Sequence, residues 1–235
     1  MIMLKKELIL QNPLRFIEAE TEDILSEAGF GAVLARAGVG KTALLVQLAL
    51  HTLLKGKYVL HISLDDPVNK ISLWYKEVFR HLTQSYDSKK TNKLWEDLLP
   101  HRFIMTFKVE GFSVPKLEER LTDLKEQNIF SPQMVLIDGF HFNETARTSL
   151  SDLKRLAKIH SLHVWFSVKT HRHEKHGPGG MPFPILDVSD LFDIVIQLQP
   201  EGKRIHVMTL KGGPEDSHRP ALFLDPATML VKNNT

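Results

Sequence analysis

Cysteine is absent from the 235 residues of this chain. Disulfide bonds and thiolate chemistry are therefore excluded. Long apolar runs are absent too, since none reaches the roughly 18 residues that a membrane-spanning helix needs. Residues 1–11 lack the apolar stretch and the cleavage site of a signal peptide. Together these absences predict a soluble cytoplasmic protein without a membrane partner.

A strong net charge is also missing. Lys and Arg number 30 against 28 Asp and Glu, which leaves a formal net charge of +2. That excess is too small to indicate nucleic-acid binding by itself. Hydrophobic residues make up 43% and charged residues 25%, the usual balance of a globular protein. The length predicts a single domain over residues 1–235, with an N-terminal helical segment at 1–27.

Short apolar runs alternate with segments of helical periodicity. We expect strands at 30–34, 58–64, 103–109, 134–137 and 163–168, and helices at 14–25, 42–54, 68–81, 115–127 and 149–160. This alternation predicts an α/β fold, with a mostly parallel central sheet and helices on both faces. Apolar runs at 192–198, 205–210 and 222–224 have no helices between them and predict a C-terminal antiparallel strand extension. Residues 84–93 are polar and indicate an exposed loop.

A glycine-rich segment joins the first expected strand to the helix at 42–54. Residues 35–42 read Ala-Arg-Ala-Gly-Val-Gly-Lys-Thr. They match the phosphate-loop pattern G-x-x-x-x-G-K-[ST], with Ala35 in place of the first glycine. The alternative, a glycine-rich turn that precedes Gly-Lys-Thr by chance, would not require the flanking strand and helix. The segment therefore predicts binding of ATP and its product ADP.

Each residue type in the loop has a chemical reason. Glycines let successive backbone N–H groups point inward, and the following helix adds its positive N-terminal dipole. A lysine neutralises charge on the β and γ oxygens during reaction, and a threonine hydroxyl binds Mg²⁺. The expected nucleotide-binding residues are Ala37, Gly38, Val39, Gly40, Lys41, Thr42 and Ala43.

Acidic residues follow two of the expected strands. Asp138 ends the run Met-Val-Leu-Ile and is our candidate for holding Mg²⁺ together with Thr42. Asp65 and Asp66 end the strand after the loop helix, and one of them is a candidate base for the attacking water, with Asp65 preferred. Both assignments have ordinary alternatives. Asp138 could cap a turn, and Asp-Asp-Pro is a common helix start.

These segments together resemble the RecA-type ATPase core, most closely the DnaB helicase and KaiC branch. The resemblance covers roughly residues 28–225 and rests on four stretches of sequence: AGVGKT, YVLHISLDD, MVLIDG and HVWFSVKTHR. It implies a RecA-like fold, ATP with Mg²⁺, and a homo-oligomeric ring or filament. The branch has a Ser-Leu-acidic sequence with glutamate as its usual acid, and Ser63-Leu64-Asp65 corresponds to it here.

The same resemblance implies roles for two lysines. Relatives place a polar residue, commonly glutamine, after the strand that ends here at Val168, and this residue senses the γ-phosphate. Lys169 occupies that position, where it either contacts phosphate or is a solvated surface charge. Relatives also carry a basic residue after a late strand that reaches the nucleotide of the neighbouring subunit. Lys211 is the candidate for that position.

Residues 171–187 are rich in Gly, Pro and His and predict a long, mobile loop. Three interpretations stay open. The loop is simply solvated, or its basic residues bind single-stranded DNA, or His171, His173 and His176 bind a metal.

Three functions fit these features. The first is a RecA-type ATPase that couples Mg-ATP binding and hydrolysis to action on a protein partner or nucleic acid. The second is a KaiC-like regulatory module with slow or no hydrolysis. The third is a nucleotide or small-molecule kinase, which would need an arginine-rich lid, whereas residues 171–187 hold only Arg172.

Overall fold

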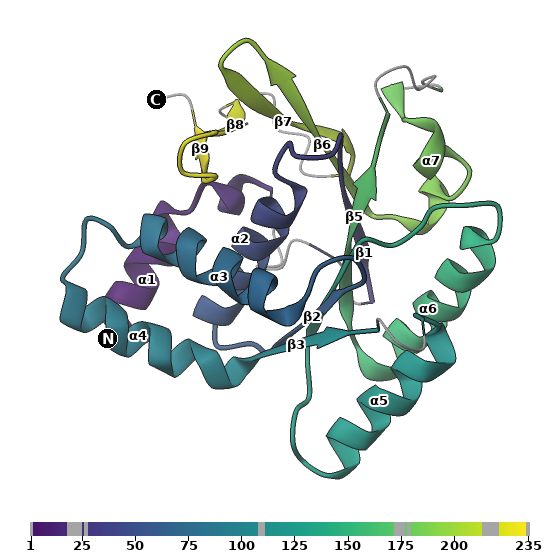
Figure 1. Ribbon diagram of the computed structural model, residues 1–235, viewed down its shortest axis with the longest axis horizontal. Coiled ribbons are helices and arrows are strands. Elements are labelled where there is room, and N and C mark those ends of the chain that lie inside the picture. The colour runs from purple at the N-terminus through teal and green to yellow at the C-terminus, as the bar shows by residue number, and fades with distance from the viewer. Residues whose placement is uncertain are drawn as a thin grey trace.

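One nine-stranded sheet organises the chain, with its strands in the order β3-β2-β4-β5-β1-β6-β7-β8-β9 (Figure 1). The computed structural model describes residues 2–17, 25, 28–107, 111–171, 177, 180–212 and 221–233. Within these ranges the strands are β1 Phe30–Ala35, β2 Val59–Ser63, β3 Arg102–Thr106, β4 Met134–Asp138, β5 His163–Lys169, β6 Ile194–Glu201, β7 Arg204–Lys211, β8 Leu222–Leu224 and β9 Val231–Asn233.

The strands from β3 to β6 in this order run parallel, and those from β6 to β9 run antiparallel. β1 and β2 are buried along their whole length, as expected for parallel strands covered by helices on both faces. The predicted α/β fold, with a mostly parallel sheet and a C-terminal antiparallel extension, is confirmed.

Two groups of helices cover the two faces of the sheet (Figure 1). The first group shares one apolar core and consists of α1 Ile2–Gln11, α2 Lys41–Leu54, α3 Val68–Leu82 and α4 Ser88–Leu98. The second group packs into the other core and consists of α5 Val114–Glu126, α6 Ala146–His160 and α7 Phe183–Leu186. Short 3-10 turns occur at η1 Pro13–Phe16, η2 Leu99–His101 and η4 Ser189–Leu191. Within the described ranges, no helix is long and apolar enough to cross a membrane.

The expected exposed loop at 84–93 is wrong, because α4 begins at Ser88. The side chain of Asp87 caps this helix by accepting a hydrogen bond from the backbone N–H of Lys90 at 3.0 Å. Thr91, Leu94 and Leu98 then form a narrow buried stripe at helical spacing. Because most residues of this helix are polar and lie on its outer face, the sequence pattern did not indicate a helix.

Differences from the sequence reading also occur near the N-terminus and in the 171–187 segment. Helix α1 lies within the helical segment expected at 1–27, although its own bounds were not predicted. The expected helix at 14–25 begins as the turn η1, and residues 18–24 of it lie outside the described part. Within 171–187, α7 forms at Phe183–Leu186 and buries Ile185, so this end of the segment is helical rather than loop.

The parallel strands bring their carboxyl ends to one edge of the sheet. Ala35 at the end of β1 pairs with Lys169 at the end of β5. Ser63 at the end of β2 pairs with Asp138 at the end of β4. In open sheets of this kind ligands bind at this edge, so the fold places the predicted site residues where a ligand is expected.

Candidate nucleotide site

The loop between β1 and α2 has the backbone conformation that phosphate binding needs. Gly38 and Gly40 both have positive φ, at 78° and 113°. At Gly40 an added Cβ would also lie 2.6 Å from Cδ2 of Leu224. Glycine is favoured there, because its φ of 113° strains a residue with a side chain and an added Cβ would have to displace the end of Leu224 in β8. The loop then enters α2 at Lys41, which aims the N-terminus of a 14-residue helix at the loop.

The C-terminal hairpin β8–β9 packs beside this loop through Gln47 of α2. The side-chain amide of Gln47 donates to the carbonyl oxygen of Met229 at 2.7 Å, and its oxygen accepts from the N–H of Val231 at 2.8 Å. This contact between α2 and the hairpin was not predicted from the sequence. A glutamine in the middle of the apolar helix 42–54 was the only signal for it.

Lys41 folds back over its own loop. Its Nζ donates to the carbonyl oxygens of Ala35 and Arg36, at 3.0 Å each. Burial lowers the pKa of Lys41, the negative charge of Asp138 opposes that shift, and the positive charge of Lys169 adds to it. Lys169 therefore lies close enough to act electrostatically on Lys41, which agrees with its pairing with Ala35 at the end of β1.

Asp138 and Thr42 meet although 96 positions separate them in the sequence. The hydroxyl of Thr42 donates to Oδ2 of Asp138 at 2.7 Å. On the other side, the hydroxyl of Ser167 donates to Oδ1 of Asp138 at 2.5 Å and accepts from the N–H of Gly139 at 2.9 Å. The carboxylate of Asp138 is thus held between two hydroxyl groups, that of Thr42 in α2 and that of Ser167 in β5.

This donor set fits a magnesium ion. Hydroxyl and carboxylate oxygens are ligands that Mg²⁺ prefers, and Thr42 and Asp138 present them next to the phosphate loop. Ser167 was missed by sequence reasoning. Its only signal was a single polar residue inside the apolar strand at 163–168, and a buried serine there, 3% exposed, needs hydrogen-bond partners.

The structure gives Asp65 and Asp66 different surroundings. Asp66 pairs with Lys70 at 2.9 Å, one helical turn along α3, and its backbone is bonded to Ser63. The carboxylate of Asp65 instead lies against the residue after Asp138, because a Cβ built on Gly139 would be 2.8 Å from Oδ2 of Asp65. Asp65 has no ion pair with any described residue.

Lys211 lies away from the phosphate loop of its own chain. It pairs with Val195 near the start of β6, a strand that runs parallel to β1, and its Nζ donates to the carbonyl oxygen of Ser189 at 2.7 Å. This position is toward the amino ends of the parallel strands. A role at the nucleotide of a neighbouring subunit stays a prediction.

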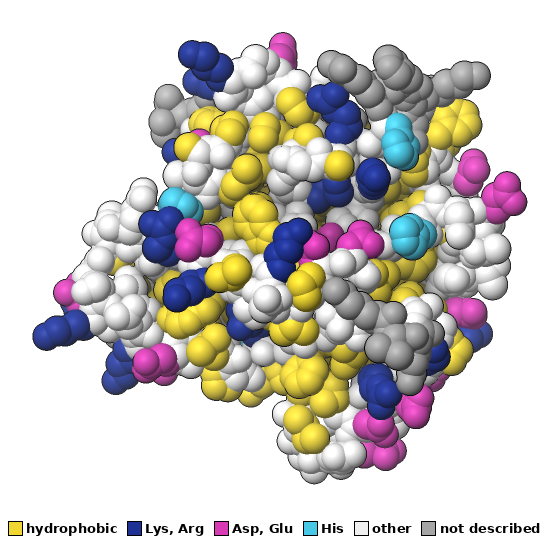
Figure 2. All heavy atoms as spheres, viewed as in Figure 1, with side chains coloured by type: hydrophobic (Ala, Val, Ile, Leu, Met, Phe, Trp, Pro, Cys, Tyr) yellow, Lys and Arg dark blue, Asp and Glu magenta, His cyan; other side chains and the backbone are white. Residues whose placement is uncertain are grey.

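Four of the five basic residues at the start of the predicted loop lie outside the described part of the chain. Residues 172–176, including His173 and His176, lie outside the described part of the chain, as do residues 213–220 after Lys211. Among the described residues, no group of three or more His, Asp or Glu side chains could hold a metal ion. Lys, Arg, Asp and Glu side chains are intermixed on the face seen in Figure 2, without a large area of one sign.

Comparison with known proteins agrees with this geometry. The AAA domain family matches residues 10–165, a span that includes both the phosphate loop and Asp138. No curated protein matches the chain. Because the family match covers well over half of the sequence, the chain belongs to the AAA domain family and is a P-loop ATPase domain of the RecA-like type.

Proposed function

We propose that the protein binds Mg-ATP at the loop 35–42 and hydrolyses it, and that it uses this cycle to act on a protein partner or on nucleic acid. The observation that carries the proposal is the hydrogen bond between Thr42 and Asp138. It brings two oxygen ligands suited to magnesium to the end of the phosphate loop, from parts of the sequence far apart.

Each residue has a role in hydrolysis. The backbone N–H groups of residues 37–43 and the ammonium of Lys41 hold the phosphate oxygens. Thr42 and Asp138 would hold magnesium, which would supply positive charge next to the transferring phosphoryl group. Asp65 accepts a proton from a water molecule while the oxygen of that water attacks the γ-phosphorus. The bond from the γ-phosphorus to the β–γ bridging oxygen breaks, and ADP leaves. Lys169 stabilises the negative charge on the γ-phosphoryl oxygens.

The alternative function, a regulatory module, uses the same ATP-binding site but hydrolyses ATP slowly or not at all. Asp65 has a side chain one methylene shorter than the glutamate usual in the DnaB and KaiC branch, which favours slow hydrolysis. In that case the bound nucleotide signals through the assembly state. Both versions include a homo-oligomer in which Lys211 reaches the neighbouring nucleotide, and the molar mass in size-exclusion chromatography with and without ATP tests that part.

Steady-state ATP hydrolysis, with and without single-stranded DNA, separates these functions. We expect Lys41→Ala to abolish ATP binding. We expect Asp65→Asn to bind ATP normally and to lose about 10²-fold or more in turnover. Asp66→Asn is the matched control, because its carboxylate pairs with Lys70, and it should keep wild-type turnover.

Equal losses in the Asp65 and Asp66 variants would contradict the assignment of the base. Tight ATP binding with negligible turnover in the wild type, with or without DNA, would favour the regulatory module over the ATPase.

A further inference from the structure

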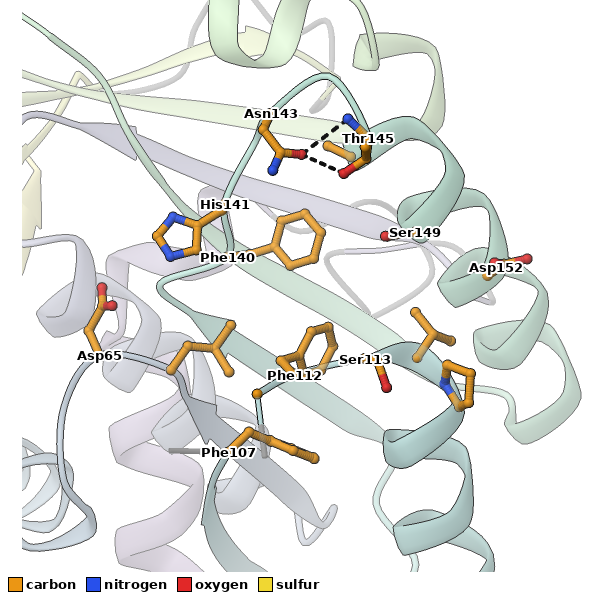
Figure 3. A pocket seen from close by; sticks show the side chains of 15 residues that line it. Asp65, Phe107, Phe112, Ser113, Phe140, His141, Asn143, Thr145, Ser149 and Asp152 are labelled. Carbon is orange, nitrogen blue, oxygen red and sulfur yellow. Dashed lines mark hydrogen bonds between the residues drawn. The ribbon is translucent and has the colours of Figure 1, made fainter. Parts of the chain in front are cut away.

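A second cavity lies next to the proposed base. It has a volume of about 720 Å³ and is formed by the ends of β2, β3 and β4 together with the first turns of α5 and α6 (Figure 3). The phosphate loop leads into α2, which belongs to the other face of the sheet. Asp65 lines this cavity and also contacts Gly139 beside Asp138. The cavity and the nucleotide site therefore meet at Asp65.

Three phenylalanines form one wall of the cavity. Phe107 and Phe112 pack edge to face with ring centroids 5.4 Å apart, and Phe112 and Phe140 do so at 6.0 Å. Phe140 continues the row to the fully buried ring of Phe166 at 5.6 Å. The three outer rings are only half-buried. The core thus extends into the cavity and leaves aromatic surface open for an apolar group.

The charged side chains that line the cavity are acidic. Asp65 lies at one end and Asp152 of α6 at the other (Figure 3). Among the described residues that line it, there is no lysine or arginine. Among the described lining residues, a phosphate-bearing ligand would meet two carboxylates and, apart from the imidazole of His141, no basic side chain, so the charges favour a positively charged group.

The cavity continues into a groove between α5 and α6. This smaller hollow, of about 50 Å³, shares Val114, Pro115 and Asp152 with the larger one and ends at Ile159, which is 63% exposed. Arg155 in the groove pairs with Asp152 at 3.0 Å, but both side chains are exposed, so this pair is easily displaced. The combined shape is elongated, which fits an extended chain better than a compact small molecule.

We propose that this cleft, defined as the cavity and the α5–α6 groove together, binds an extended segment of a partner protein that carries a large apolar side chain and a nearby Lys or Arg. The apolar side chain occupies the space against Phe107, Phe112 and Phe140. The cation pairs with Asp65 or Asp152. Hydroxyl groups of Ser113 and Ser149, which also line the cavity, are available to the backbone of the segment.

Binding at the cleft is coupled to the nucleotide because Asp65 belongs to both sites. A cation paired with Asp65 occupies the carboxylate that would otherwise accept the proton from the attacking water. Partner binding then slows ATP turnover. This coupling rests on the proposed hydrolysis, whereas segment binding does not.

The test uses the full-length chain and a random heptapeptide library. Peptides selected on the wild-type protein should share an aromatic or large aliphatic residue close to Lys or Arg. A fluorescein-labelled peptide with that consensus should bind about tenfold or more weakly to Ser149→Trp, which fills the cleft, and to Asp152→Lys, which reverses its charge. Thr148→Trp and Glu119→Lys are the matched controls, because these exposed residues do not line the cleft, and they should bind like the wild type.

Two comparisons separate this proposal from others. Lys41→Ala should lose ATP binding and keep peptide binding, so a failure of the nucleotide proposal leaves the cleft result intact. Fluorescein-labelled oligo-dT tests nucleic acid as the occupant. The proposal would be overturned if the selected peptides shared no consensus or an acidic one, or if all four variants bound the peptide equally. It would also be overturned if Ser149→Trp lost binding of oligo-dT rather than of the peptide.

Discussion

Ser167→Ala tests how the carboxylate of Asp138, which we propose holds magnesium, is oriented. The serine hydroxyl is buried and makes two hydrogen bonds, to Oδ1 of Asp138 at 2.5 Å and from the N–H of Gly139 at 2.9 Å. Removing the hydroxyl leaves the N–H without its partner, which costs about 1–3 kcal/mol when the group is buried. Asp138 and Gly139 are half-buried, so water replaces part of the loss. We therefore expect the free energy of unfolding to fall by about 2 kcal/mol.

The same substitution should also weaken magnesium-dependent binding. A carboxylate that loses one of its two fixed donors is less well oriented, and the loss of such a supporting group costs about 10-fold or more in metal affinity. Urea unfolding measures the first effect. Titration of a fluorescent ATP analogue, with and without Mg²⁺, measures the second.

Ser151→Ala provides the matched control. Ser151 is an exposed serine on α6 whose hydroxyl bonds only to the carbonyl oxygen of Arg147 one turn earlier. We expect its urea midpoint and its magnesium dependence to match the wild type. If Ser167→Ala behaved in the same way, Thr42 alone would orient Asp138 and our account of the carboxylate would be refuted.

Three further predictions concern packing, pH and the C-terminal hairpin. In Gly31→Ala the new Cβ would lie 2.5–2.7 Å from three ring carbons of the buried Trp165. The thermal midpoint should therefore drop by the equivalent of about 1–3 kcal/mol. An unchanged midpoint would contradict this contact. Burial lowers the pKa of His61 from 6.5 to about 4, so the folded state resists its protonation and stability is lost as pH falls from 6.5 toward 4. This loss is about 2 kcal/mol at pH 5, and urea midpoints at pH 7.5 and 5 should differ less in His61→Phe than in the wild type. Gln47→Leu leaves two backbone groups of the β8–β9 hairpin without partners, and hydrogen exchange in residues 229–231 should become faster while that of β4 stays slow.

Secondary structure was predictable wherever one pattern dominated a segment. The apolar strands β1, β2, β4 and β5 and the helices α2, α3 and α5 appear within a few residues of their expected positions. Helix α4 was missed because its buried stripe is narrow and its polar residues outnumber the apolar ones. Helix α1 falls within the helical segment expected at 1–27, but the sequence did not indicate its bounds. It buries only Leu4 and Leu8 and leaves Ile2, Met3 and Leu10 exposed, so its sequence has no clear apolar face.

The sequence by itself determined the phosphate loop and its carboxylate. The loop is a contiguous motif, so glycine spacing, lysine and threonine are all visible locally, and Asp138 directly follows an apolar strand. These signals need no knowledge of which strands are neighbours.

Only the tertiary structure decided which side chains meet. The strand order placed Ser167 beside Asp138, turned Asp65 toward Gly139 and left Asp66 with Lys70. It also formed the cleft from the ends of β2, β3 and β4 and from α5 and α6. The physical reason is that hydrogen bonds and cavities depend on distances across the sheet, and those distances are set by strand order and register rather than by separation along the chain.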